Sequence, residues 1–394
     1  MSAMLAGKDL VCFSSQRWHF VWQRSQQLLS RAARDRRVWF VEDPIESDET
    51  EARLEVITLG DRLSLVVPHV PASWPAQARC LAQRDLLTDL WRARRFDQPV
   101  LWYTTPAALS YSRTLATGCV VYDCTDAPSL RAEVPASLTK LDTEMLDRAD
   151  LVFTGGVALF EALKHRHKAV HAFPGSVDTT HFATARTGLP VPPDQAMLGG
   201  PIVGMVGVLD DRLDAQLLAS VATARPELQF VLLGPLARSE ASLPVARNIH
   251  YIGHKSYEQL PSYLAGWHVA MLPFAHNDAT RYISPTSVPE YLAAGRPVVA
   301  TSITDVVRPY GVQRLVRIAD DPAAFAQAID HALADGQGRQ ARADAFLAHL
   351  SWDRTWQDMH ALIASSARRP RPAAQGRAVS RAPVGTVAAR TFTS

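Results

Sequence analysis

The sequence predicts an α/β protein made of two facing Rossmann-like domains with a cleft between them. Short runs of β-branched and aromatic residues alternate with amphipathic stretches along most of the chain. A segment rich in proline and glycine at residues 184–200 interrupts this alternation, and the same rhythm resumes after it. The 394 residues are also too many for one core, because single domains typically contain ~100–200 residues.

The first domain is predicted to occupy residues 1–183. Its strands are expected from runs such as LVCFS and CVVYDC, at 10–14, 38–42, 63–67, 100–104, 119–124, 150–155 and 169–173. Helices are expected between several of these strands, at 18–33, 77–94, 137–148 and 156–165. Because the strands are apolar on both faces, the pattern favours a parallel sheet covered by helices.

Residues 184–200 are predicted to be a linker without a packed element, and residues 201–350 to form the second domain. Its strands are expected at 201–209, 228–234, 248–253, 267–274, 296–302 and 314–319. Its helices are expected at 213–223, 256–265, 286–294 and 322–334. In open α/β sheets, ligands bind at the carboxyl ends of the strands, so two such domains imply a ligand site in the cleft.

The chain is predicted to end in a helix at 351–365 that returns toward the N-terminal domain, and in a disordered basic tail at 366–394. The tail contains six Arg and no Asp, Glu or Lys. The other 35 basic and 39 acidic residues give the two domains a net charge of −4. This near balance argues against a nucleic-acid-coating protein. The tail is suited either to peripheral contact with an anionic membrane or to a plain disordered extension.

The sequence gives no sign of export, of a membrane span or of a metal site. The N-terminus lacks a signal-peptide pattern, and no apolar stretch reaches the ~18 residues of a transmembrane helix. We therefore expect a cytoplasmic protein, at most peripheral at the inner face of the membrane, without a cofactor. Free thiols are expected at Cys12, Cys80, Cys119 and Cys124, and His165, His167 and His171 are interpreted as a solvated basic helix end.

Residues 271–300 contain a pattern suited to binding a phosphate. The loop before the helix near 288–294 carries one cation and three hydroxyls, namely Arg281, Ser284, Thr286 and Ser287. Hydroxyls and free N–H groups at a helix start bind anions, and Glu290 one turn later could accept hydrogen bonds from ribose hydroxyls. The same pattern also fits a Ser/Thr-capped helix in which Glu290 is an ordinary first-turn acid. No Asp-x-Asp occurs, which weakens any mechanism built on a divalent ion.

Residues 290–299, EYLAAGRPVV, resemble the donor-binding segment of GT-B nucleotide-sugar glycosyltransferases of the group 1 type. In that family a Glu-x7-Glu pair ends in this context, and the first glutamate position is Tyr282 here. Ser287 stands where relatives in exopolysaccharide and teichuronic acid synthesis often have Lys. Similar segments are found at 13–34, 120–126, 151–156, 173–182, 204–214 and 248–274, so the resemblance extends from about residue 10 to 360.

The resemblance implies roles for further residues of the second domain. Gly204 and Gly207 would end the first strand and let a phosphate approach the backbone. Arg212 would contact the diphosphate, Lys255 lies in the turn that holds the nucleotide base, and Glu290 would bind the ribose. Many family members retain anomeric configuration by a front-face attack that needs no protein nucleophile, so stabilisation of the leaving diphosphate dominates catalysis.

Two residues of the first domain are candidate catalytic bases. His19 follows the first strand, and Asp126 follows strand 119–124 together with Asp123. A hydrogen-bonded or solvated histidine and a turn-capping aspartate are the competing interpretations.

The sequence thus predicts a metal-independent, retaining hexosyltransferase-type enzyme. It would move a sugar from a nucleotide-sugar donor to a glycan or lipid-linked acceptor in cell-surface polysaccharide synthesis. Two alternatives stay open. One is a catalytically silent nucleotide-sugar-binding protein, which is favoured by the departures from the family pattern at Tyr282 and Ser287. The other is a nucleotide-sugar epimerase on the same fold.

Overall fold

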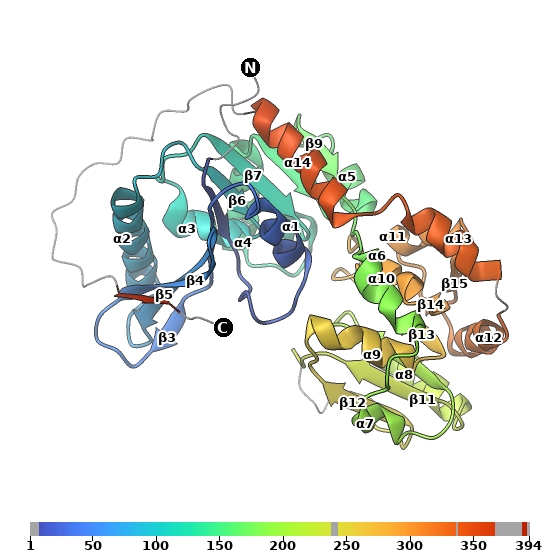
Figure 1. The fold of residues 1–394 in the computed structure, drawn as a ribbon. Coiled ribbons are helices and arrows are strands. Elements are labelled where there is room, and N and C mark those ends of the chain that lie inside the picture. The colour runs from blue at the N-terminus through green and yellow to red at the C-terminus, as the bar shows by residue number, and fades with distance from the viewer. Residues whose placement is uncertain (1–7, 238–242, 336–337, 367–387, 392–394) are drawn as a thin grey trace. The chain divides into compact units, whose positions relative to one another are not determined.

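The computed structural model describes residues 8–237, 243–335, 338–366 and 388–391 (Figure 1). The chain divides into two compact units. Unit 1 contains residues 1–155, 160–173 and 355–394, and unit 2 contains residues 156–159 and 174–354.

The described strands of unit 1 form one ten-stranded sheet, in the order β16-β4-β5-β2-β1-β6-β7-β8-β9 with β3 beside β5. Their bounds are β1 Leu10–Phe13, β2 Val38–Val41, β3 Ile45–Ser47, β4 Arg53–Gly60, β5 Leu63–Pro71, β6 Val100–Tyr103, β7 Cys119–Cys124, β8 Leu151–Thr154, β9 Val170–Ala172 and β16 Ala388–Thr391. Every residue of β1, β2, β6, β7 and β8 is buried, as expected for strands covered on both faces.

One edge of this sheet differs from the predicted all-parallel arrangement. β4 pairs antiparallel with β5, with Val56 opposite Val66. Along β4, buried Leu54 and Val56 alternate with partly exposed neighbours, which is typical of a strand with one solvated face. The sequence analysis missed β3 and β4 because it searched for continuous apolar runs.

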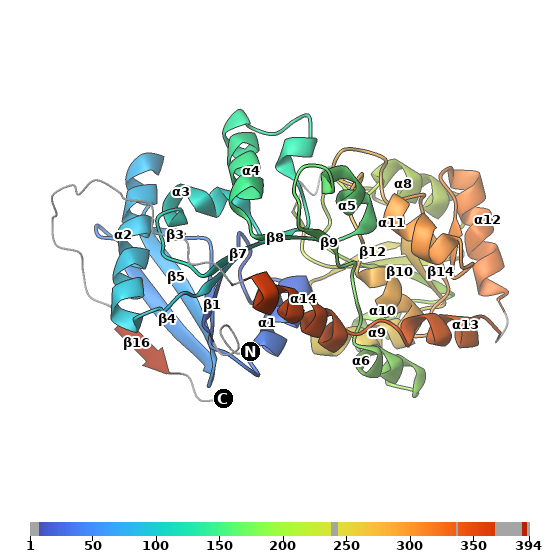
Figure 2. The same ribbon diagram turned by 90° about the horizontal axis from the view of Figure 1, so that it is seen from above.

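Helices cover both faces of the unit 1 sheet. Figure 2 shows α1 and α14 on one side and α3, α4 and α5 on the other. The helix bounds are α1 Arg24–Ala32, α2 Ala76–Arg94, α3 Leu109–Ser112, α4 Ala136–Arg148, α5 Val157–Leu163 and α14 Trp352–Ser366. The predicted helix 18–33 begins only at Arg24, because the Trp18 N–H donates to Glu42 Oε1 at 2.8 Å and the Trp18 carbonyl accepts from Gln26 Nε2 at 2.9 Å.

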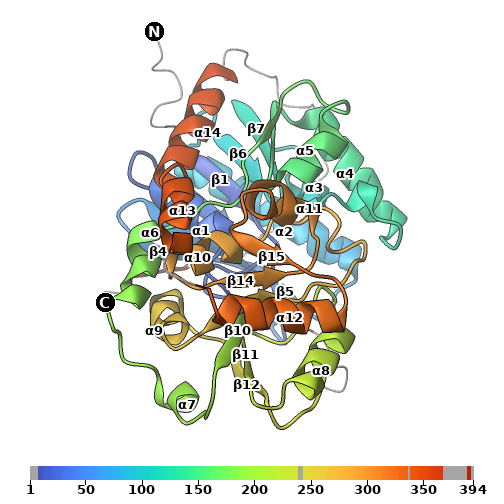
Figure 3. The same cartoon turned by 90° about the vertical axis from the view of Figure 1, so that its right-hand side faces the viewer.

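Unit 2 is built on a six-stranded parallel sheet in the order β12-β11-β10-β13-β14-β15. The strands are β10 Ile202–Val206, β11 Gln229–Leu233, β12 Ile249–Gly253, β13 Val269–Leu272, β14 Val298–Ala300 and β15 Val316–Ile318. The helices are α6 Thr179–Ala183, α7 Pro193–Ala196, α8 Ala215–Ala224, α9 Leu260–Ala265, α10 Ser287–Ala293, α11 Thr304–Val306, α12 Pro322–Leu333 and α13 Gly338–Leu347, with a π-helical segment at Val307–Gly311. Figures 2 and 3 show α8, α11 and α12 on one face and α6, α9, α10 and α13 on the other.

The predicted linker at 184–200 contains a packed element, contrary to expectation. Within it, α7 places Gln195 in the core of unit 2, where its side chain is fully buried. The Gln195 amide donates to the Tyr263 carbonyl at 2.9 Å and accepts from Trp267 Nε1 at 2.8 Å. A buried indole N–H needs an acceptor, and hydrophobic periodicity cannot show which residue provides it.

Most of the predicted tail lies outside the described residues, at 367–387 and 392–394. Residues 388–391 are described, and they form β16, which pairs in parallel with β4. At these four residues the structure differs from the predicted disorder, because the outer edge of β4 offers backbone groups that an added strand can pair with.

The described cysteines are free: Cys12, Cys119 and Cys124 are buried and Cys80 is partly exposed. No helix in the described part of the chain is long and apolar enough to cross a membrane.

Candidate functional site

The helix α10 is fastened to the carboxyl end of β10 by a buried tyrosine. Tyr291 Oη accepts a hydrogen bond from the Val206 N–H at 2.7 Å and lies 3.3 Å from the Val206 carbonyl. The Ser287 side chain also hydrogen-bonds to Tyr291. The first turn of α10 is therefore held at the strand ends where open α/β sheets bind their ligands.

Glu290 lies in this first turn with a carboxyl that is poorly solvated. Burial raises the pKa of Glu290 to about 8. In the described chain, no hydrogen bond or ion pair engages its side chain, so nothing replaces the water that burial removes. A carboxyl in this state favours a ligand that brings hydrogen-bond donors, such as a pair of vicinal hydroxyls.

The ends of β10 and β11 approach each other closely through two glycines. The Gly207 N–H donates to the Leu233 carbonyl at 2.9 Å. A Cβ at Gly234, whose φ is +148°, would lie 1.8 Å from the Gly207 carbonyl oxygen. A Cβ at Gly207 would meet only the Met205 methyl, at 3.7 Å, so the backbone at Gly207 is open on that side. This opening is compatible with the predicted approach of a phosphate.

Gly204 lies inside β10 and packs against an indole. A Cβ at Gly204 would stand 2.1 Å from Trp267 Cε2 and 2.2 Å from Cδ2. Trp267 is 1% exposed and fully enclosed by unit 2. The contact that requires this glycine is therefore the packing of Trp267, and a role beside a phosphate stays a prediction.

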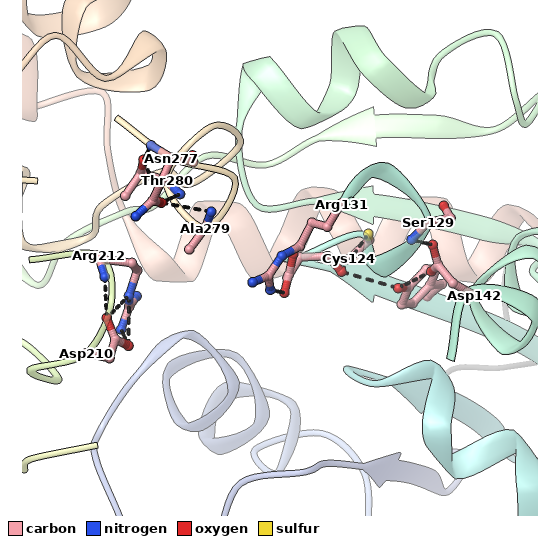
Figure 4. A network of polar contacts seen from close by, with 11 residues as sticks. Cys124, Ser129, Arg131, Asp142, Asp210, Arg212, Asn277, Ala279 and Thr280 are labelled. Atoms are coloured by element: carbon pink, nitrogen blue, oxygen red, sulfur yellow. Dashed lines mark hydrogen bonds and ion pairs between the residues drawn. The ribbon is translucent and has the colours of Figure 1, made fainter. Parts of the chain in front are cut away.

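Arg212 is held by a neighbouring acid. Its Nε and Nη2 donate to Asp210 at 2.8 and 2.7 Å (Figure 4). The loop after β13 docks on this pair, since Asn277 Nδ2 donates to the Asp211 carbonyl at 2.8 Å and the Ala275 N–H donates to the Arg212 carbonyl at 2.8 Å. The predicted diphosphate cation is thus largely neutralised by Asp210.

Arg281 is the more available cation of the predicted segment. It is exposed, and its guanidinium lies over the ring of Tyr282 at 5.3 Å from the centroid. No described acid pairs with it. The Tyr282 ring therefore contacts this cation through its face.

Ser284 and Thr286 face residues that the sequence analysis did not single out. The Ser284 hydroxyl bonds to Asp305, a buried acid that also accepts the backbone N–H groups of Val157 and Ala158 of unit 2, both at 2.8 Å. Burial, the largest influence on this acid, raises the pKa of Asp305 despite these bonds. Thr286 is the residue before α10, and its methyl would lie 2.9 Å from a Cβ at Gly175.

Lys255 is engaged within unit 2. Its Nζ donates to Asp194 Oδ2 at 2.9 Å and lies 5.1 Å from the ring centroid of Tyr263. Tyr263 Oη also donates to Asp194, at 2.8 Å. Hydrogen bonds to Tyr263 and Asp194 hold the pKa of Lys255 above its usual value. A role for Lys255 at a nucleotide base would have to be compatible with this ion pair.

The two candidate bases of unit 1 are not brought into contact with each other. His19 is exposed in the loop after β1, and Asp126 pairs with Arg131 at 2.9 Å. Asp123, the other acid after β7, is 1% exposed and is held by Arg24 at 2.8 Å, so it has a structural partner. Figure 4 also shows buried Asp142, which accepts from the Ser129 N–H at 3.0 Å.

The described residues contain no group of three or more His, Cys, Asp and Glu side chains placed to hold a metal. In the histidine cluster, His167 Nε2 lies 3.0 Å from the Ala149 carbonyl, and burial lowers the pKa of His171.

Residues 200–335 match the family model described as glycosyl transferases group 1. This stretch is a group 1 glycosyltransferase domain. It includes β10 to β15 and α10, so Glu290, Arg281, Arg212 and Lys255 all belong to the glycosyltransferase domain.

About half of the chain is similar to a curated bacterial protein. The chain is 25% identical over 233 residues to TuaH of Bacillus subtilis strain 168, which is described as a teichuronic acid biosynthesis glycosyltransferase. The alignment covers 53% of this chain and 58% of that protein. The chain therefore matches little more than half the length of this relative.

Solved structures show that the fold is GT-B. Sucrose-phosphate synthase from Thermosynechococcus elongatus has a TM-score of 0.70 at 16% identity, covering 90% of this chain and 98% of that one. An α,α-trehalose-phosphate synthase (UDP-forming) from Burkholderia vietnamiensis has a TM-score of 0.66 at 14% identity, covering 91% and 100%. An Escherichia coli structure described as trehalose-6-phosphate bound with UDP-2-fluoro glucose has a TM-score of 0.68 at 14% identity, covering 92% and 100%.

Four side chains that hold the segments of the candidate site in place were not predicted from the sequence. Tyr291, Asp194, Gln195 and Asp305 all act through side-chain bonds to segments distant in the chain. Tyr291 alone had a signal, because it directly follows Glu290 in the matched segment.

Proposed function

We propose that the chain is a glycosyltransferase that moves a sugar from a nucleotide-sugar donor to a glycan or lipid-linked acceptor in cell-surface polysaccharide synthesis. The group 1 domain at 200–335 and the similarity to TuaH support this activity. The observation that carries it is the Glu290 carboxyl, which is half-buried near the strand ends and lacks a hydrogen-bond donor in the described chain. Two ribose hydroxyls would supply the missing donors.

Binding of the ribose by Glu290 has a consequence for pH. Hydroxyls donate most strongly to an ionised carboxylate, so bound ribose favours the charged form and lowers the pKa of Glu290. Donor binding then releases a proton below the free-state pKa of about 8. Affinity for the nucleotide is expected to rise with pH toward 8 and to level off above it.

The leaving diphosphate would be stabilised mainly by Arg281, and the open backbone at Gly207 would leave room for it. Arg212 would contribute less while Asp210 binds it. We propose a metal-independent, retaining reaction in which the leaving phosphate accepts the proton of the acceptor hydroxyl. Because the leaving phosphate takes this proton, His19 and Asp126 are proposed to position the acceptor rather than to form a covalent intermediate.

The test is a thermal-shift titration with UDP-, GDP- and dTDP-sugars, followed by hydrolysis and transfer assays with the best binder, with and without EDTA. Glu290→Gln should weaken binding at least tenfold and remove its pH dependence, and Arg281→Gln should reduce turnover more than binding. Glu227→Gln, which alters an exposed glutamate of the same unit, is the matched control.

Three outcomes would contradict parts of the proposal. Binding without turnover in any acceptor mixture would favour the silent nucleotide-sugar-binding protein. Interconversion of two nucleotide sugars without an acceptor would favour the epimerase. Equal affinity in the wild type and Glu290→Gln would remove Glu290 from the ribose site.

A further inference from the structure

A pocket of about 550 Å³ in unit 2 lies away from the strand ends that hold Glu290. It follows β15, the edge strand of the sheet, and is closed by α12 and the start of α13. Val298 and Leu315 in its wall lie at the amino-terminal ends of β14 and β15. Ile318 and Ala319, at the carboxyl end of β15, also line the pocket, so it runs along the whole of this edge strand.

The pocket has an apolar floor and a basic rim. Leu315, Val316, Ala324 and Ala328 contribute apolar surface to its wall. The polar residues around it are Arg314, Arg317, Arg339, Arg342, His331, Gln327 and Asp335. Four guanidinium groups therefore face one carboxylate within the described lining.

Asp335 cannot neutralise this rim. It pairs with Arg317 at 2.5 Å and lies 3.9 Å from Arg339, so a single negative charge serves two cations. Arg314 and Arg342 are exposed and pair with no described acid. Burial and the neighbouring cations Arg296, Arg342 and Arg186 lower the pKa of Arg339, although Asp335 opposes them, which indicates uncompensated positive charge.

Two buried donors of the rim also lack acceptors. The Nε atoms of Arg317 and Arg339 are enclosed, and neither donates a hydrogen bond within the structure described. Because these two atoms are enclosed, a ligand in the pocket would be bound through the exposed guanidinium groups of Arg314 and Arg342, which line it.

We propose that this pocket binds a small phosphate monoester, with the phosphate on the arginine rim and the uncharged part of the ligand on the apolar floor. Guanidinium groups bind phosphate through paired, charge-assisted hydrogen bonds. The start of α13 adds a favourable helix dipole. A soluble phosphorylated metabolite is the expected source, because the binding groups line a concave pocket.

The pocket is linked to the helix that carries Glu290. Arg339 Nη1 and Nη2 donate to the carbonyls of Arg296 and Gly295 at 3.1 and 3.0 Å, just after the end of α10. A phosphate that orders the Arg339 guanidinium would also strengthen the attachment of α10. This regulatory step rests on the proposed function, whereas binding of the phosphate does not.

The test is isothermal titration of the full chain with phenyl phosphate, using phenol as the neutral analogue. The wild type should bind phenyl phosphate and not phenol. Arg314→Gln/Arg342→Gln should weaken binding at least tenfold, while Arg247→Gln, at an exposed arginine before the opposite edge strand β12, should bind as the wild type does. Unchanged affinity in the double variant, or equal binding of phenol, would overturn the proposal.

Two further arms separate the sources and the sites. Flotation with vesicles containing phosphatidic acid tests a lipid headgroup; binding to these vesicles without binding to phenyl phosphate would overturn the soluble ligand. Titration with saturating UDP tests the donor site; competition by UDP that the double variant does not alter would place the phosphate there instead. If both ligands bind at once, UDP affinity should rise severalfold with phenyl phosphate, and by reciprocity the converse should hold. Independent binding would refute the coupling alone, and absence of UDP binding would refute the proposed function alone.

Discussion

Substitution of Gly204 by alanine should strongly destabilise unit 2. The new methyl would lie 2.1–2.4 Å from three atoms of the Trp267 ring, whereas ordinary contacts begin near 3.4 Å. The indole would have to move by more than 1 Å from a site where it is 1% exposed. Overpacking of this kind costs about 1–3 kcal/mol. Losing the 2.8 Å bond from Trp267 Nε1 to Gln195 adds about 1–3 kcal/mol, because the buried donor is left unpaired.

The free energy of unfolding of unit 2 should therefore fall by about 2–6 kcal/mol, the sum of these two estimates. Urea unfolding with hydrogen-exchange readout on peptides of β10 and α9 measures this change in the full chain. Trp267→Leu also destabilises, but it removes the ring that the methyl strikes, so the double variant should be more stable than the two single effects predict. Additive effects, or a stable Gly204→Ala protein that has lost only nucleotide affinity, would show that the glycine serves a phosphate and not the indole.

Three other changes test single interactions. Burial raises the pKa of Glu290 from 4.5 to about 8, so the folded state binds this proton more tightly than the unfolded state. The free energy of unfolding should therefore fall as pH rises from about 4.5 to 8, by up to ~1.4 kcal/mol per pH unit. Glu290→Gln should remove this slope in urea titrations at a series of pH values. Arg36 is 2% exposed, and none of the described residues accepts a hydrogen bond from its three guanidinium nitrogens. Arg36→Met should therefore raise the free energy of unfolding of unit 1 by about 1–3 kcal/mol; a lower value would reveal a partner. Tyr291→Phe should cost unit 2 about 1–3 kcal/mol by orphaning the Val206 N–H, and an unchanged melting temperature would argue against this bond.

The alternation of strands and helices was predictable because it depends on local periodicity. The predicted strand 119–124 has the same bounds as β7, and the predicted helix 77–94 differs from α2 by one residue. The antiparallel pair of β4 and β5 was missed, because half-buried strands lack the continuous apolar run that marks buried ones. The late start of α1 was missed as well, because Glu42 holds the preceding loop from a neighbouring strand.

The candidate site was predictable only in part. The segment around Glu290 could be found from its sequence, because a helix start with hydroxyls and an acid is a local pattern. Which cations are available could not be found in this way. Arg212 is bound by an acid two residues away, and Lys255 by Asp194, sixty-one residues away in the chain.

By itself, the sequence determined the two arrays of strands and helices, the helix that carries Glu290 and the low net charge. These properties depend on the order of residues in short segments and on composition, so they do not depend on contacts between distant segments. Only the tertiary structure decided that Gly204 accommodates an indole, that Asp194 occupies Lys255 and that Glu290 is left without a partner in the described chain. The physical reason is that hydrogen bonds, ion pairs and desolvation act over a few ångströms in space. They often join residues that are far apart in the chain, and the sequence does not show which of these residues are close together.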